Sequence, residues 1–262
     1  MNIKFQILNN RKQRKIMKIL FSLFIIMSGI MAIAACSDPN TQLINAIKDN
    51  DVKAAQKAIE KGADVNICDK NGEPAIILAL DLKRKRIALE MLKQKIDVNV
   101  KTPDGTSALM MASARPEIEL YLPILDKGGI INDHNNYGMT PLMFAAKTAY
   151  IDAILSLIQK KSYMNAQDKD GNTALMIAII NKKNSIVRVL ADNKSLMNIQ
   201  NNQGKTPLIL AVENGSIEIV DLLLKRGADP KIKDNEGMDA LSVANKEGKQ
   251  VIYNILKNDN SK

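Results

Sequence analysis

The chain has very few of the residues on which most catalytic and metal sites depend. It contains one histidine, two cysteines, no tryptophan and 3% aromatic residues in a length of 262. A zinc site needs several nitrogen or sulfur ligands, and nothing indicates that a nucleophilic serine or Cys68 meets His134. Two cysteines also cannot form a disulfide-based scaffold. We therefore expect no catalytic residues, no metal site and no cofactor, and we predict that the protein is not an enzyme.

The net charge of +9 does not indicate a nucleic-acid-binding protein, because it is concentrated at one end. Residues 1–35 hold six basic residues and no acidic one, so residues 36–262 carry 31 basic and 28 acidic residues, a balance of +3. A Lys-Arg-Lys-Arg run covers residues 83–86. It could contact an anionic lipid or an acidic partner, or it could simply be a solvated face. We expect no nucleic-acid partner and no small-molecule substrate.

Glycine recurs at a fixed interval of 33 residues, which indicates a chain built from stacked copies of one unit. Alanine keeps the same interval seven times and asparagine five times. The three series are Gly72, Gly105, Gly138, Gly171, Gly204 and Gly237; Ala46, Ala79, Ala112, Ala145, Ala178, Ala211 and Ala244; and Asn66, Asn99, Asn132, Asn165 and Asn198.

Each part of the unit has a physical interpretation. The glycine often follows Asn or Asp, a pair that tolerates the positive φ of a tight turn. Two residues later comes a residue that can cap a helix, and Pro141 and Pro207 follow at the first helical position. A second apolar-periodic segment ends, in the clearest copy, at Gly227. We predict a turn, a helix, a short loop, a second helix and an extended return. The expected capping residues are Ser107, Thr140, Thr173, Thr206 and Asp239.

This pattern resembles the ankyrin repeat, a turn plus two helices over 33 residues with the motif T-P-L-H-x-A. The best match runs from Asn202 to Ala211 and continues to Asp229. The resemblance implies an all-α fold, an α-solenoid of about seven stacked units within residues 36–262. The expected units are 38–68, 69–101, 102–134, 135–167, 168–200, 201–233 and 234–262.

Several departures from the repeat pattern give further expectations. Methionine, isoleucine or serine replaces the usual histidine, so the hydrogen bonds of that histidine must be absent or made otherwise, and these residues should pack in the core. Lys95, Lys161 and Lys194 replace the glycine after the second helix, and we expect those helix ends to be less sharply closed. Pro123 lies inside the second helix of unit 102–134 and should kink it. We expect that unit to be the weakest.

The N-terminal segment resembles a bacterial lipoprotein signal peptide. Six basic residues precede a run of 17 uncharged and mostly apolar residues, Ile19 to Ala35, which ends directly before Cys36. The resemblance implies that residues 1–35 are removed and that Cys36 is acylated, with palmitate among the possible chains, and anchors the protein to the membrane of a bacterial cell envelope. An uncleaved transmembrane anchor and a plain signal peptide are the alternatives. Translation could start at Met1 or at Met17.

The resemblance implies a partner surface along the hairpin tips and the exposed side of the first helices. A tyrosine with apolar neighbours at the middle of that surface would suit a binding hot spot, although Tyr137 could instead pack on the next hairpin. We expect a protein–protein interaction module; the alternative is an immunity or inhibitor protein that masks an enzyme or toxin through the same surface. The candidate contact residues are Tyr137, Met139, Lys147, Lys169, Asn172, Ile180 and Lys205.

Overall fold

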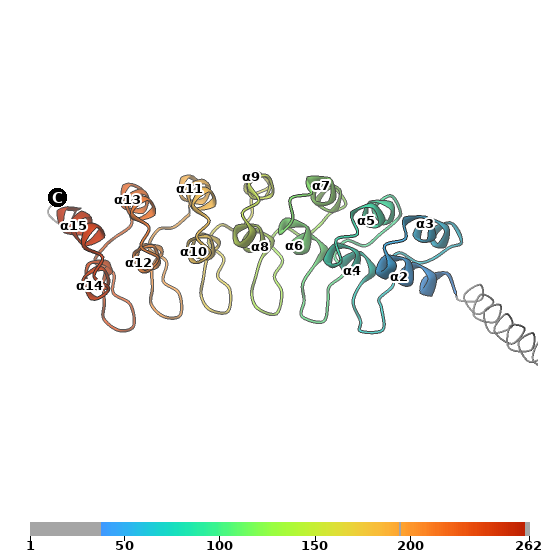
Figure 1. Ribbon diagram of the computed structural model, residues 1–262, viewed down its shortest axis with the longest axis horizontal. Coiled ribbons are helices and arrows are strands. Elements are labelled where there is room, and N and C mark those ends of the chain that lie inside the picture. The colour runs from blue at the N-terminus through green and yellow to red at the C-terminus, as the bar shows by residue number, and fades with distance from the viewer. Residues whose placement is uncertain (1–37, 194, 260–262) are drawn as a thin grey trace, which may run out of the picture.

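The computed structural model describes residues 38–193 and 195–259, and these form a single row of helix pairs. Figure 1 shows the inner helices in one row, the outer helices in a second row, and the hairpin loops projecting along one edge. The seven pairs are α2 (Pro39–Asp49) and α3 (Val52–Glu60), α4 (Ala75–Asp81) and α5 (Lys85–Leu92), α6 (Ala108–Ser113) and α7 (Ile118–Asp126), α8 (Pro141–Thr148) and α9 (Ile151–Gln159), α10 (Ala174–Ile180) and α11 (Asn184–Asp192), α12 (Pro207–Glu213) and α13 (Ile217–Lys225), and α14 (Ala240–Lys246) and α15 (Gln250–Asp259). The predicted all-α solenoid is confirmed.

Each inner helix from α6 to α14 begins as the sequence predicts. The hydroxyl or carboxyl oxygen of the capping residue accepts a hydrogen bond from the amide three residues later, which satisfies one of the unpaired amides of the first turn. The methionines that replace the histidine are buried. At two of them the sulfur accepts the amide of the capping residue, Met110 from Ser107 at 3.5 Å and Met143 from Thr140 at 3.4 Å. Methionine thus fills the core, and at two positions its sulfur also accepts a backbone hydrogen bond.

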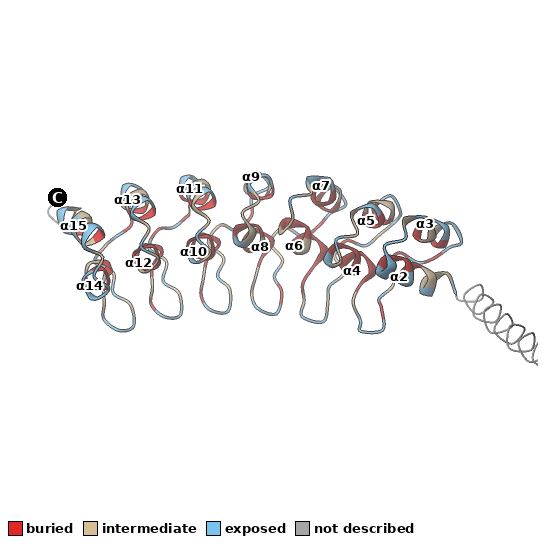
Figure 2. Cartoon of the chain, in the orientation of Figure 1, coloured by how far each residue is buried: buried red, intermediate tan, exposed pale blue. Residues whose placement is uncertain are grey.

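The alanine column forms the contact between consecutive inner helices. All seven alanines are buried, and Ala178 at the middle of α10 has no exposed surface. Figure 2 shows that the inner helices from α4 to α12 are mostly buried, whereas the end helices α2 and α14 and the outer helices expose one side. A methyl group at this position lets neighbouring helices approach closely, so a larger or charged side chain has no room.

The hairpins are tied both to themselves and to their neighbours. At most turns an Asp or Asn side chain accepts the amides two and four residues later, as Asp168 does from Asp170 and Asn172. All six glycines of the series have positive φ, between 74° and 81°. At Gly204 a Cβ atom would also lie 2.6 Å from the backbone nitrogen of Asn235 in the next hairpin. Glycine is therefore required there by backbone conformation and by close approach.

The asparagine column connects each unit to the next. The side-chain oxygen of Asn132 accepts the amide of Tyr163 at 2.7 Å, and the same bond recurs for each of the five asparagines, always 31 residues along the chain. The amide nitrogen of Asn99 also donates to the Gly128 carbonyl at 3.1 Å. The Asn99 side chain thus satisfies one backbone donor and one backbone acceptor of the following unit, in the turn after helix α7.

Unit 102–134 is irregular at a loop as well as at Pro123. Helix α7 runs from Ile118 to Asp126 with Pro123 inside it, and the kink and the lower stability expected of this unit stay predictions. A further departure lies earlier, in the loop between α6 and α7. The other six units place a residue with positive φ at this point, namely Asn50, Lys83, Ala149, Lys182, Gly215 and Gly248. Unit 102–134 has Pro116 there, and the proline ring excludes a positive φ.

The helix ends without glycine differ from one another. Lys161 adopts the left-handed conformation itself, with φ of 65°, and Ser162 donates to the Leu157 carbonyl as Ala63 does to Ala58. The expectation of a looser end is therefore wrong at Lys161. Lys95 makes no such turn, and the corresponding bond back to α5 is missing, as expected. Lys194 lies outside the described residues.

We expect Ala178→Asp to unfold or strongly destabilise the solenoid. Overpacking costs roughly 1–3 kcal/mol, and the unpaired buried carboxylate adds a larger penalty. Thermal unfolding followed by circular dichroism tests this. Because stability in a repeat array depends on neighbouring units, Ala244→Asp in the last inner helix should cost less. An Ala178→Asp variant that melts like the wild type would contradict the packing model.

We expect Asn99→Ala to lower the free energy of unfolding by about 1–2 kcal/mol, because it removes two inter-unit bonds and leaves the Ile130 amide unpaired. Urea denaturation measures the change. Asn245→Ala is the matched control, since Asn245 is exposed on α14 and belongs to no column of inter-unit bonds. Equal midpoints for the two variants would show that the asparagine column does not stabilise the stack.

Candidate binding surface

The predicted contact residues fall on the hairpins and on the C-terminal ends of inner helices. Tyr137 is 60% exposed and Ile180, the last residue of α10, is 44% exposed. Lys147 and Lys169 are also exposed, in the last turn of α8 and near a hairpin tip. These four residues could contact a partner without any rearrangement of the solenoid.

Tyr137 is held in place by its backbone. Its amide donates to the Asn135 side chain at 3.0 Å, and its carbonyl accepts the amide of Lys169 in the next hairpin at 2.9 Å. The same carbonyl-to-amide link joins Asp104 to Asn136 and Asp170 to Asn202. The side chain is 60% exposed, so the next hairpin does not enclose it.

The other three predicted contact residues have structural partners. Met139 is half-buried and packs against the core. The Asn172 oxygen accepts a hydrogen bond from the Asn201 side chain at 3.0 Å, which links two hairpins. Lys205 pairs with Glu213 at 2.6 Å, and its side chain is 21% exposed. These three residues therefore hold the hairpins in place, and their side chains are less available to a partner.

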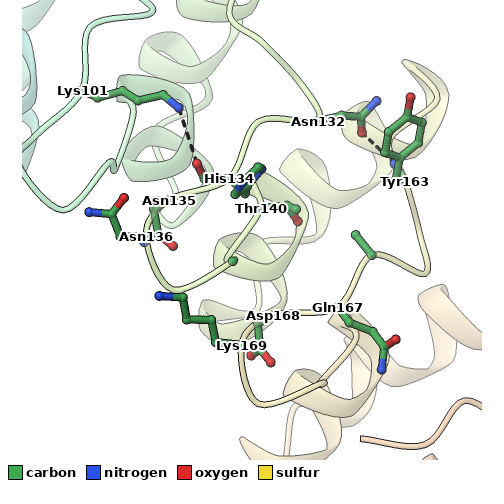
Figure 3. A pocket seen from close by; sticks show the side chains of 12 residues that line it. Lys101, Asn132, His134, Asn135, Asn136, Thr140, Tyr163, Gln167, Asp168 and Lys169 are labelled. Atoms are coloured by element: carbon green, nitrogen blue, oxygen red, sulfur yellow. Dashed lines mark hydrogen bonds between the residues drawn. The ribbon is translucent and has the colours of Figure 1, made fainter. Parts of the chain in front are cut away.

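A groove of about 990 Å³ lies between the hairpins of units 135–167 and 168–200. Figure 3 shows Lys101, His134 and Tyr163 among the side chains around it; Lys101 donates to the His134 carbonyl at 3.4 Å. Asp168 also lines the groove. Burial raises the pKa of Asp168, although the amides of Asn172 and Asp170 donate to its carboxylate and oppose the rise. The groove is open, and most of the residues that line it have polar side chains.

The structure exposes three apolar side chains that the sequence interpretation did not single out. Ile130 is 51% exposed, Tyr163 68% and Leu196 57%, and each follows an outer helix at the same place in its unit. The corresponding residues in neighbouring units are Asp97 and Asp229. An apolar residue in a column that is acidic elsewhere was a signal available in the sequence.

The basic run at residues 83–86 has a structural explanation for two of its members. The Arg84 guanidinium donates to the carbonyls of Ile47 and Lys48, both at 3.1 Å, and so caps the end of α2. Lys85 pairs with Glu119 at 3.1 Å. The run therefore joins adjacent units instead of forming a uniform basic face.

Comparison with known proteins identifies the family. Residues 88–168 and 150–234 match the family model described as ankyrin repeats in three copies, and together they cover more than half of the chain. The chain therefore belongs to the ankyrin-repeat family, whose members are protein–protein interaction modules and generally not catalysts. No curated protein matches the sequence.

Cys36 and the preceding apolar run lie outside the described residues. Among residues 38–193 and 195–259, no helix is both long enough and apolar enough to cross a membrane. Cys68 is exposed. In the same residues, no group of three or more His, Cys, Asp and Glu side chains is placed to hold a metal ion.

Proposed function

We propose that this protein is a membrane-anchored interaction module that binds another protein outside the cytoplasm. Residues 1–35 would direct export and be removed, and acylated Cys36 would hold the solenoid at the membrane of a bacterial cell envelope. The partner would lie along the hairpin tips and the ends of the inner helices. The exposure of Tyr137 and Ile180 among mostly polar hairpin residues carries the assignment as a binding module, and the sequence pattern before Cys36 carries the membrane anchor.

The charged residues on this face support a partner whose surface has both apolar and polar groups. Lys147 and Lys169 are exposed close to Tyr137 in the repeat pattern, whereas Lys205 is neutralised by Glu213. A central aromatic anchor surrounded by such polar groups is typical of protein interfaces. The backbone links at Tyr137 keep the hairpin in one conformation, which limits the entropy lost on binding.

We expect Tyr137→Ala to weaken partner binding by roughly 1–3 kcal/mol, the range for an interfacial aromatic anchor. The partner is first captured with the mature protein from its own cell envelope, and its affinity is then measured by calorimetry. The melting temperature should change little, because the ring is exposed.

Leu155→Ala is the control for this experiment. Leu155 is also a large exposed apolar residue, at 48%, but it lies on the outer helix α9 and not at a hairpin tip. An unchanged affinity for Tyr137→Ala excludes Tyr137 as the anchor, and a large drop in its melting temperature would assign the ring to packing instead.

The lipid anchor makes a separate prediction. The wild-type chain should incorporate radiolabelled palmitate and have Cys36 as its mature N-terminus, whereas Cys36→Ala should accumulate as an unlabelled precursor. Cys68→Ala is the control, because Cys68 lies in a hairpin of the solenoid and should not affect labelling. A labelled Cys36→Ala variant, or a wild-type chain without label, would contradict the anchor.

A further inference from the structure

Three exposed apolar side chains form a row along the return segments of the three central units. Ile130, Tyr163 and Leu196 are 51%, 68% and 57% exposed, and each comes shortly after an outer helix. The backbone amide of each donates to a column asparagine of the preceding unit, at 3.0, 2.7 and 2.9 Å. Since stacked helices lie about 8–10 Å apart, this apolar row is roughly 20 Å long. Its backbone is fixed, whereas its side chains are in solvent.

The apolar row costs the fold a hydrogen bond in each of its units. In the units on either side the same position is aspartate, whose carboxylate accepts the amide two residues later: Asp97 accepts from Asn99 at 2.8 Å, and Asp229 from Lys231 at 2.9 Å. An aliphatic side chain cannot accept this bond. The three apolar residues also do not belong to the core or pack against it. Folding therefore does not explain why they occupy this column.

The helix ends directly before the apolar row are mainly basic. Lys127, Lys160 and Lys161 are exposed at the ends of α7 and α9. Among the described residues in the last turns of α7, α9 and α11, Asp192 forms an ion pair, which leaves Asp126 as the acidic residue without one. Lysine at a helix C-terminus also suits the helix dipole, so the charges alone would not indicate a site. Beside an exposed apolar row they favour a surface that is both anionic and apolar.

The apolar row uses different residues from the proposed partner surface. Figure 3 shows the Tyr163 ring away from Asn136 and Lys169, which belong to two successive hairpins. Tyr137, the proposed anchor of the protein partner, lies in the first of these hairpins. Contact at the row and contact at the hairpin tips are therefore separate interactions.

The membrane anchor proposed above determines which large surface is near the row, and this inference rests on it. Only Ser37 and Asp38 lie between Cys36 and the first residue of α2. Two residues extend over about 7 Å at most, so an acylated Cys36 would hold the first unit close to the lipid headgroups. A solenoid held so closely at one end can lie along the membrane, where lipid is the surface that an exposed row meets.

We propose that the apolar row, together with Lys127, Lys160 and Lys161, lies on the anionic lipid surface to which Cys36 anchors the chain. The apolar side chains enter the headgroup region, where tyrosine is especially favoured, and the lysine ammonium groups contact lipid phosphates. A single acyl chain gives only weak anchoring, and a protein surface that binds lipid adds to it. This contact also orients the solenoid on the membrane.

The experiment measures co-sedimentation of the solenoid with lipid vesicles. Residues 36–262 with Cys36→Ser contain every described helix but no acyl chain, so binding reports the protein surface alone. Vesicles of phosphatidylglycerol and phosphatidylcholine are compared with vesicles of phosphatidylcholine only. At low salt we expect about tenfold tighter binding to the anionic vesicles. The difference should decrease at high salt, because ions screen the lysines.

A triple variant with Ile130→Asn, Tyr163→Asn and Leu196→Asn tests the apolar row. Asparagine can accept the amide two residues later, as aspartate does in the neighbouring units, so this variant should melt at or above the wild-type temperature. It should nevertheless bind the anionic vesicles about tenfold more weakly, because the side chains that enter the headgroup region are gone. A retained melting temperature excludes unfolding as the cause.

A second variant tests the charges, with Lys160→Gln and Lys161→Asn. Asparagine tolerates the left-handed conformation that Lys161 adopts, so the turn is kept. The variant retains the apolar row and should lose about tenfold in its preference for the anionic vesicles.

Glutamine at the first residues of α7, α9 and α13 provides the matched control. Ile118, Ile151 and Ile217 are 38%, 39% and 46% exposed, but they lie at the opposite ends of their outer helices from the return segments. This triple variant also removes three exposed apolar side chains and should bind both kinds of vesicle like the wild type.

The proposal is overturned if the wild-type surface shows no preference for anionic vesicles, if the asparagine variant binds like the wild type, or if the glutamine control loses binding equally. A chain that is dimeric in analytical ultracentrifugation, and monomeric once the row is replaced by asparagine, would assign the row to a second copy instead. Palmitate labelling tests the anchor separately. Label without vesicle binding would refute only the lipid contact, and vesicle binding without label would refute only the anchor.

Discussion

The structure depends on hydrogen bonds that pass from the backbone of one unit to the next. Inner helices of six to eleven residues are too short to be stable alone, and none of them can bury its apolar face without a neighbour. The asparagine column and the hairpin carbonyls fix the distance and the register between units. Once this spacing is set, alanine is the side chain that fits between the inner helices, and glycine is the residue that fits at the hairpin turn.

The same ladder explains why the hairpin edge can serve as a binding surface. The backbone of a residue such as Tyr137 is hydrogen-bonded to its neighbours, whereas its side chain remains exposed. The fold therefore tolerates wide variation at the tips while the backbone stays in place. Functional specificity in such a protein depends on which side chains occupy those tips, and much less on the fold itself.

The sequence predicted the features that obey local rules. The turn glycines, the helix caps and the buried alanines follow from φ preferences, capping chemistry and helical periodicity, and the structure confirms them. The features that the sequence did not predict concern competition between positions. Helix α7 continues through Pro123, whereas Pro116 stands where the other units have a positive φ and so alters its loop. Lys161 shows the converse, since its unit imposes the left-handed turn on a residue that disfavours it.

The candidate sites were less predictable than the fold, because exposure at a given column depends on three-dimensional neighbours. Met139 and Lys205 occupy columns expected at the surface, but Met139 packs against the core and Lys205 forms an ion pair with Glu213. The apolar residues at positions 130, 163 and 196 and the proline at position 116 share a simpler property: each differs from the residues that occupy its column in other units. In a repeat protein every unit is a control for the others. A residue that breaks the pattern of its column without stabilising the stack therefore indicates a constraint other than folding.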